Sequence, residues 1–191
     1  MIISVLQFSR HKRRSVMTKM TLKGLLIVFS TFFFAACAHN PSLNVVPHVD
    51  LKRYTGTWYE IASYPTSFQK GCIGTKATYS QREDGDIDVL NQCYKKGFDA
   101  DITSAKGKAW VVDKTTNAKL KVRFFWPFWG SYWIIDLGKN YDYSVVGHPS
   151  RKYLWVLSRT PQMDDVLYYE ILGRITQQGY DTSKLVKTIQ K

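Results

Sequence analysis

Eight short strand-like segments follow one another from residue 57 to residue 159 of this 191-residue chain. Each is rich in β-branched and aromatic residues, and turn signals such as Asp84-Gly85 and Pro127 separate them. This pattern predicts an all-β fold, a barrel or a sandwich. An eight-stranded antiparallel up-and-down barrel leaves no open sheet edge and holds at most one small ligand. The expected strands are residues 57–64, 75–80, 87–94, 102–112, 118–126, 131–137, 143–147 and 153–159.

The fifth segment alternates most clearly between apolar and basic residues. Residues two apart in a strand point the same way, so one face is expected to be interior and the other solvated. A packed sandwich would explain this alternation equally well. The apolar face holds Leu120, Val122, Phe124 and Trp126, and the basic face holds Lys119, Lys121 and Arg123.

A single helix is expected after the last strand. Asp164 and Asp165 suit its positive N-terminal end, and Gly179 is a typical stop. Apolar residues recur at helical spacing between them, which predicts a stripe that packs against the outside of the barrel. The stripe consists of Val166, Tyr169, Leu172 and Ile175.

The N-terminal segment has the layout of a secretory signal. Two lysines precede an uncharged run that ends in Phe34-Ala35-Ala36-Cys37. The small residues before the cysteine resemble a bacterial lipobox, which implies that Cys37 is acylated and begins the mature protein. An ordinary signal peptide with a free Cys37 is the alternative, and the run is shorter than the roughly 20 apolar residues of a membrane-spanning helix. We expect a lipoprotein signal peptide over residues 1–36, a lipidated linker over 37–49 and a barrel domain over 50–191.

Charge and composition narrow the range of partners. The formal charge of +12 falls to +6 without residues 1–36, because that segment holds six cations and no acid. The remaining charge is spread along the chain, which favours anionic lipid head groups over nucleic acid. The four histidines are scattered and no Cys-x-x-Cys occurs, so neither a metal nor a cofactor is expected. Cys72 and Cys93 are expected to form a disulfide in an exported protein, and a catalytic thiol is the alternative.

Three separated motifs resemble the signature of the lipocalin family. They are Gly56-x-Trp58 at the first strand, Asp142-Tyr143 before the seventh, and Arg159 at the end of the eighth. The resemblance runs from about residue 48 to the C-terminus and implies an eight-stranded calyx with one C-terminal helix outside. Gly56 permits a tight swing of the chain, Trp58 plugs one end, and Arg159 stacks on that indole. These are structural roles, and no catalytic residue is expected.

With the lipobox, the chain resembles the bacterial outer-membrane lipoproteins of this family. That resemblance implies a non-enzymatic protein that binds and stores or transports fatty acids or lysophospholipids and supports membrane maintenance under stress. It also implies an acyl anchor in the outer membrane and a barrel that faces the periplasm, and it allows a homodimer. Two alternatives stay open: a lipocalin-type isomerase or synthase that uses Cys72 or Cys93, and a packed-barrel interaction lipoprotein.

Alternation along the strands supplies candidates for the ligand-lining face. Phe68, in the long first loop, is expected at the mouth, and Glu60 is expected to be buried and hydrogen-bonded to a tyrosine. The density of aromatic residues from 124 to 133 exceeds what the interior holds, so some rings must face a membrane interface or a partner subunit. The inward candidates are Ala62, Tyr79, Val89, Val111, Val122, Phe124, Tyr132, Ile134, Val145 and Trp155.

Overall fold

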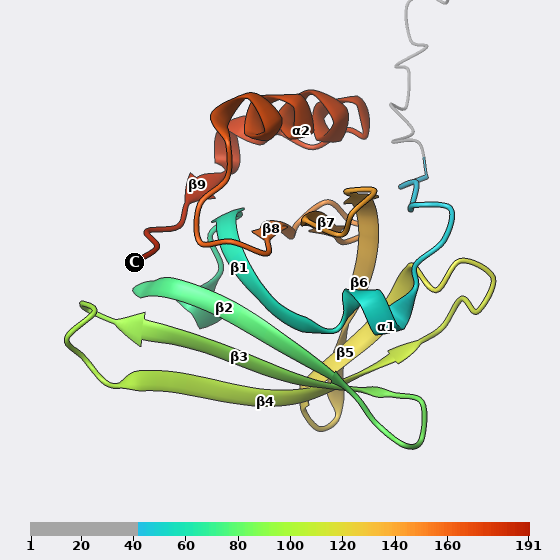
Figure 1. The fold of residues 1–191 in the computed structure, drawn as a ribbon, viewed down its shortest axis with the longest axis horizontal. Helices are drawn as coiled ribbons and strands as arrows, with labels where there is room; N and C mark the ends of the chain where they lie inside the picture. The colour runs from blue at the N-terminus through green and yellow to red at the C-terminus, as the bar shows by residue number, and fades with distance from the viewer. Residues whose placement is uncertain (1–41) are drawn as a thin grey trace, which may run out of the picture. The chain divides into compact units, whose positions relative to one another are not determined.

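A closed antiparallel barrel dominates the computed structural model, which describes residues 42–191 (Figure 1). Its strands are β1 (Gly56–Ser63), β2 (Cys72–Gln81), β3 (Ile87–Lys95), β4 (Ile102–Val111), β5 (Lys119–Phe125), β6 (Phe128–Leu137), β7 (Tyr143–Gly147) and β8 (Leu154–Ser158). They are ordered β2-β3-β4-β5-β6-β7-β8-β1, and β1 also pairs with β2, which closes the ring. The predicted eight-stranded barrel is therefore confirmed, and each strand end lies within three residues of its expected position.

The two ends of the barrel differ because neighbouring strands are antiparallel. The connections β1–β2, β3–β4, β5–β6 and β7–β8 share one end, which we call the open end. The opposite end carries the other connections and the short helix α1 (Leu51–Tyr54), which precedes β1. The Asp50 side chain caps α1 by accepting from the amides of Lys52 and Arg53. We call this second end the closed end.

Helix α2 (Asp165–Gln177) follows β8, as the sequence predicted. The Asp164 carboxylate accepts from the Leu167 amide at 3.1 Å and caps its first turn. The predicted stripe is wrong in part, because Val166 and Tyr169 are exposed. The face that packs against the barrel is displaced around the helix axis and consists of Tyr168, Ile171 and Ile175.

The C-terminal tail adds a ninth strand that the sequence did not predict. Strand β9 (Val186–Lys187) pairs antiparallel with β1, and it follows the 3₁₀ turn Thr182–Lys184. The tail then reaches β2, since the Gly74 amide donates to the Ile189 carbonyl at 2.7 Å. Direct pairing between β1 and β2 ends at Tyr59. After Tyr59, the C-terminal tail connects the two strands by bonding to both.

Apolar side chains form two separate clusters. The interior cluster lies inside the barrel, and the helix-side cluster lies between the barrel and α2. The buried interior cluster comprises Val49, Tyr54, Trp58, Tyr79, Ile87, Val89, Ala109, Ala118, Leu120, Ile134, Val146 and Leu157. The buried helix-side cluster comprises Leu43, Ile61, Ala62, Tyr64, Ile135, Val145, Leu154, Val156, Tyr168, Ile171, Ile175 and Tyr180.

Candidate functional site

Trp58 and Arg159 seal the closed end of the barrel, in the roles that the sequence predicted for them. Trp58 is fully buried, and the Arg159 guanidinium lies 3.8 Å from the centroid of its indole ring. Gly56 has a φ of +94°, and an added Cβ would lie 3.2 Å from the Arg159 side chain. A side chain at this position would therefore be strained and would crowd the guanidinium.

The Asp142-Tyr143 motif lies in the turn beside this plug. The Asp142 carbonyl accepts from the Arg159 amide, whereas the Tyr143 hydroxyl contacts Asp136 and Arg174 outside the barrel. Tyr141, with a φ of 60°, also contributes, because its hydroxyl accepts from the Asp50 amide at 2.8 Å. The turn is thereby tied to the segment that enters β1.

Three tyrosines lie together inside the barrel. The Tyr54 hydroxyl is 2.8 Å from that of Tyr132 and 2.9 Å from the Ser144 hydroxyl, and Tyr132 donates to the Tyr79 hydroxyl at 3.0 Å. Burial raises the pKa of Tyr54 to about 12 and raises the pKa values of Tyr79 and Tyr132. All three phenols are therefore neutral near pH 7.

A small cavity of about 20 Å³ adjoins these tyrosines. No charged side chain is among the residues that line it. This volume suits one water-sized group, so side chains fill most of the barrel at this depth. The lining residues are Tyr54, Tyr79, Ile87, Val89, Ala109, Leu120, Val122 and Tyr132.

Eight of the predicted inward residues belong to or pack against the interior cluster. Several are only partly buried, among them Val122, Phe124 and Trp155. The eight residues are Tyr79, Val89, Val111, Val122, Phe124, Tyr132, Ile134 and Trp155.

The inward placement of Ala62 is wrong, because this residue lies in the helix-side cluster. The β1–β8 register shifts between Glu60 and Ala62. Glu60 is paired with Leu157 of the interior cluster, but Ala62 is paired with Val156 of the helix-side cluster. One extra residue in β1 thus reverses the alternation.

The inward placement of Val145 is also wrong, since it too lies in the helix-side cluster. The β6–β7 register shifts between Ile134 and Asp136. Ile134 is paired with Val146, and both belong to the interior cluster, whereas Asp136 is paired with Val145. The inward residues of β7 are therefore the two neighbours of Val145.

Three aromatic side chains, Phe68, Tyr153 and Trp155, pack together at one side of the open end. Phe68 is exposed in the β1–β2 connection, and its ring centroid lies 6.4 Å from that of Tyr153. Tyr153 stacks on Trp155 at 6.0 Å, and the Trp155 indole donates to the Gln69 side chain at 3.0 Å. Phe68 therefore lies near the mouth, as expected. Its ring packs against Tyr153 at the rim and is not part of the interior cluster.

Glu60 is buried as predicted, but its partners are not tyrosines. Its carboxylate accepts from the side chains of Ser63 at 3.0 Å, Gln69 at 2.7 Å and Thr188 at 2.6 Å. Gln190 donates to the Glu60 carbonyl at 2.7 Å. Two of these partners belong to the C-terminal tail, whose return to β1 no local sequence pattern indicates.

The β5–β6 connection exposes four large rings at the open end. We call Phe125, Trp126, Phe128 and Trp129 the aromatic tip; their exposed fractions lie between 56% and 82%. The Lys121 ammonium lies 3.7 Å from the Trp129 ring centroid. The expected excess of aromatic rings is thus placed outside the barrel.

The predicted disulfide joins Cys72 and Cys93, whose Cα atoms are 5.4 Å apart. A simple hairpin register would place Cys72 opposite Gly97. A register shift between Ile73 and Lys76 instead pairs Cys72 with Lys95. Residues 42–191 therefore contain no free thiol.

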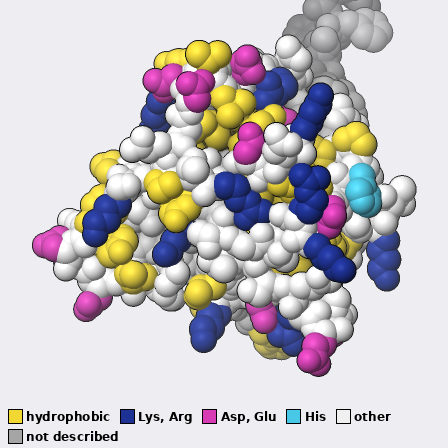
Figure 2. Space-filling view, viewed as in Figure 1, with side chains coloured by type: hydrophobic (Ala, Val, Ile, Leu, Met, Phe, Trp, Pro, Cys, Tyr) yellow, Lys and Arg dark blue, Asp and Glu magenta, His cyan; other side chains and the backbone are white. Residues whose placement is uncertain are grey.

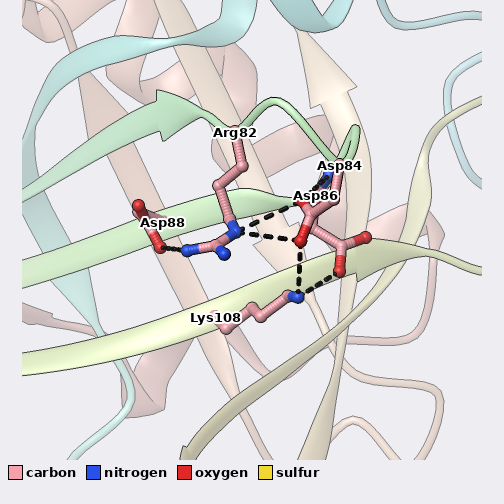
Figure 3. Close-up of polar contacts among 5 residues, drawn as sticks. All are labelled: Arg82, Asp84, Asp86, Asp88 and Lys108. Atoms are coloured by element: carbon pink, nitrogen blue, oxygen red, sulfur yellow. Dashed lines mark hydrogen bonds and ion pairs between the residues drawn. The ribbon is translucent and has the colours of Figure 1, made fainter.

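A network of ion pairs links the β2–β3 turn to β4 (Figure 3). Arg82 contacts Asp84 and Asp88, while the Lys108 ammonium lies 3.1 Å from Asp84 and 2.7 Å from Asp86. Hydrogen bonds from the Asp86 amide and from Lys108 lower the pKa of Asp84 to about 2. These carboxylates are paired with cations, and residues 42–191 contain no cluster of groups suited to a metal.

Other surface features lie away from the interior. Lys and Arg side chains are scattered among hydrophobic ones on the face in Figure 2. A groove of about 650 Å³ lies outside the barrel, bordered by residues 42–45, Lys119, Trp133 and residues 149–151. None of the predicted ligand-lining residues borders this groove.

Cys37 and residues 1–36 lie outside the described residues. Within residues 42–191, no helix has the length and hydropathy needed to cross a membrane.

Comparisons with known proteins agree with this architecture. A family model described as a lipocalin-like domain matches residues 49–190. The outer membrane lipoprotein Blc of Escherichia coli K12 is 39% identical over 174 residues, which cover 87% of this chain and 96% of the relative. Temperature-induced lipocalin-1 of Arabidopsis thaliana is 41% identical over 160 residues, which cover 78% and 83%. Insecticyanin from the tobacco hornworm Manduca sexta matches the fold with a TM-score of 0.65 at 20% identity, over 79% of this chain and 86% of that structure.

Proposed function

This chain belongs to the lipocalin family, and we propose that its barrel binds a hydrophobic ligand through the open end and carries it at the outer membrane. The observation that carries the proposal is the uncharged lining of the barrel cavity. Phe124 and Trp155 continue this apolar lining as partly buried side chains that pack against the interior cluster. A mostly apolar lining with a few hydroxyl groups is the chemistry typical of small-molecule sites, and the cavity of about 20 Å³ must widen to hold a ligand.

We propose a ligand with a single acyl chain, such as a fatty acid or a lysophospholipid. The deep part of the barrel is nearly filled, so one narrow chain fits better than two. The connections at the open end carry four cations and two acids, which favours an anionic or zwitterionic head group at the rim. The cations are Lys70, Lys96, Arg151 and Lys152, and the acids are Asp99 and Asp101.

We further propose that acyl chains on Cys37 anchor the protein in the outer membrane, with the barrel in the periplasm. The lipobox-like sequence before Cys37 supports this, as does the name of the relatives, outer membrane lipoprotein. Stable anchoring needs two membrane signals, such as two acyl chains or one chain with a second membrane contact.

The aromatic tip would supply such a second contact. Trp126 and Phe128 are the most exposed of its rings, and Lys121 lies beside Trp129. Tryptophan is favoured at membrane interfaces, and lysine is attracted to anionic lipids. We propose that the tip touches the membrane surface, so that the open end receives ligand there. A second copy of the chain could cover the same rings, and this would be seen as a dimer.

A packed barrel without a ligand is the second candidate, and the cavity of only about 20 Å³ favours it. An enzyme that uses Cys72 or Cys93 is disfavoured, because both sulfur atoms are in the disulfide. The interior of a carrier must widen when the acyl chain of a ligand enters, whereas a packed barrel binds no ligand.

Titration with a fluorescent fatty acid distinguishes the carrier from the packed barrel. Val122 lines the cavity, so Val122→Trp should abolish binding by filling it. Val166→Trp is the matched control, because Val166 is exposed on α2. Absence of binding to the unmodified protein would support the packed barrel, and equal binding by both variants would exclude the interior as the site.

A further inference from the structure

The hydroxyl groups inside the barrel form a chain with one surplus proton. Four hydroxyls belong to it, and three hydrogen bonds connect them. Tyr132 donates its only proton to Tyr79, so Tyr54 must donate to Tyr132 and Ser144 to Tyr54. The Tyr79 proton is left over. Within residues 42–191 the bond from Tyr132 is the only hydrogen bond of the Tyr79 hydroxyl.

This surplus donor is deeply buried beside an open space. Tyr79 is only 7% exposed and lines the 20 Å³ cavity. The remaining lining is aliphatic except for Tyr54 and Tyr132, whose protons are already used in the chain. A buried donor without an acceptor is unfavourable, and the cavity has room for one oxygen-sized group.

We propose that this cavity receives a neutral oxygen atom of the ligand, which accepts the proton of the Tyr79 hydroxyl. The ligand class is therefore an acyl or similar chain with a hydroxyl or oxo group at its far end, with its polar head at the rim. This inference rests on the proposed function and adds the chemistry that the barrel selects.

The surroundings of Tyr79 favour a neutral oxygen over a carboxylate. No cationic side chain lines the cavity, and an unpaired carboxylate there would lose its hydration without compensation. Burial raises the pKa of Tyr79, so its hydroxyl stays a neutral donor throughout the physiological pH range. A plain methyl end would leave the proton unpaired.

A matched pair of probes tests the proposal: hexadecanoic acid and 16-hydroxyhexadecanoic acid, titrated calorimetrically against the chain from Asn40 onward. Residues 40–191 form a compact unit of their own. The same pair with 12 carbons is also titrated, because the length of the acyl chain determines how far its end reaches into the barrel. We expect the hydroxylated member of at least one pair to bind about tenfold more tightly, because it satisfies the buried donor.

Two tyrosine variants identify the group that causes this preference. Tyr79→Phe should bind both members of each pair equally, because it removes the surplus proton and leaves the ring. Tyr169→Phe removes an exposed phenol on α2 and should keep the preference. If Tyr79→Phe fails to fold, Val89→Thr provides a second test, since a hydroxyl beside the cavity should also weaken the preference.

The outcomes separate this inference from the proposed function. Failure of all four fatty acids to bind would overturn the carrier function itself. Equal binding of both members of each pair by the unmodified protein would overturn only the inference and would indicate that a trapped water accepts the proton. A preference that survives Tyr79→Phe would also overturn it.

Discussion

The guanidinium of Arg159 lies over the indole of Trp58, with its Cζ atom 3.8 Å from the ring centroid. The same group donates to backbone carbonyls of Thr57 at 3.0 Å, Arg53 at 2.7 Å and Tyr141 at 3.2 Å. One side chain thus joins the end of β8 to the entry of β1 and to the β6–β7 turn. This explains why the lipocalin signature combines residues that are distant in sequence.

Replacement of Arg159 by alanine should lower the free energy of unfolding by about 3 kcal/mol, because a cation–π contact and several charge-assisted hydrogen bonds are lost. Arg159→Lys should recover little, since an ammonium lacks the planar fork of donors. Chemical denaturation measures both. Arg82→Ala, in the exposed ion-pair network, is the control and should change stability much less. Equal effects of Arg159→Ala and Arg82→Ala would contradict this role.

Alkaline pH should destabilise the barrel between about pH 10 and pH 12. The ordinary pKa of a tyrosine is 10.0, whereas burial raises the pKa of Tyr54 to about 12 in the folded protein. Its contribution is thus fully present below pH 10 and is lost as the pH rises through 12, at a cost of about 3 kcal/mol. Denaturation at several pH values measures the fall. Tyr54→Phe should reduce it and Tyr169→Phe should not; an identical fall in both would contradict the assignment.

The strands could be predicted from the sequence because alternation and turn residues are local patterns. The closed end could be predicted because Gly56, Trp58 and Arg159 resemble the lipocalin signature, which implies their roles there. The face of Ala62 could not be predicted, because a register shift in β1 reverses its alternation without a clear signature in the sequence. The face of Val145 depends on the pairing of β7 with β6, where the extra residue lies in β6.

Long-range contacts explain the remaining differences. The partners of Glu60 include Thr188, which lies 128 residues away in the chain. The hydroxyl chain brings Tyr54, Tyr79, Tyr132 and Ser144 together from four separate segments. The sequence predicted a hydrogen-bonded partner only for Glu60, and the register of the closed barrel determines which groups each of these side chains meets.

Reduction of the Cys72–Cys93 disulfide should lower the free energy of unfolding by about 3 kcal/mol, because the bond closes a loop with a separation of 21 residues. The double variant Cys72→Ala/Cys93→Ala should show the same loss without reductant. Alkylation of folded, unreduced residues 40–191 should label no thiol. Two labelled cysteines per chain would contradict the bond.

Removal of the aromatic tip should weaken membrane contact. Trp126→Ser/Phe128→Ser should reduce binding of residues 40–191 to vesicles of phosphatidylethanolamine and phosphatidylglycerol at least tenfold. Val166→Ser/Tyr169→Ser, on the exposed face of α2, should bind as the unmodified chain does. Co-sedimentation measures both. Unchanged binding by the tip variant, with loss of a dimer in sedimentation velocity, would assign the tip to self-association instead.

The central claim is that the barrel carries a hydrophobic ligand. Native mass spectrometry of the protein, purified in mild detergent from the membranes of cells that express the full chain, tests it most directly. We predict one bound single-chain amphiphile per barrel, which is released on denaturation and is absent from Val122→Trp but present in Val166→Trp. A native mass equal to that of the denatured, acylated chain, in cells with and without membrane stress, would contradict the claim.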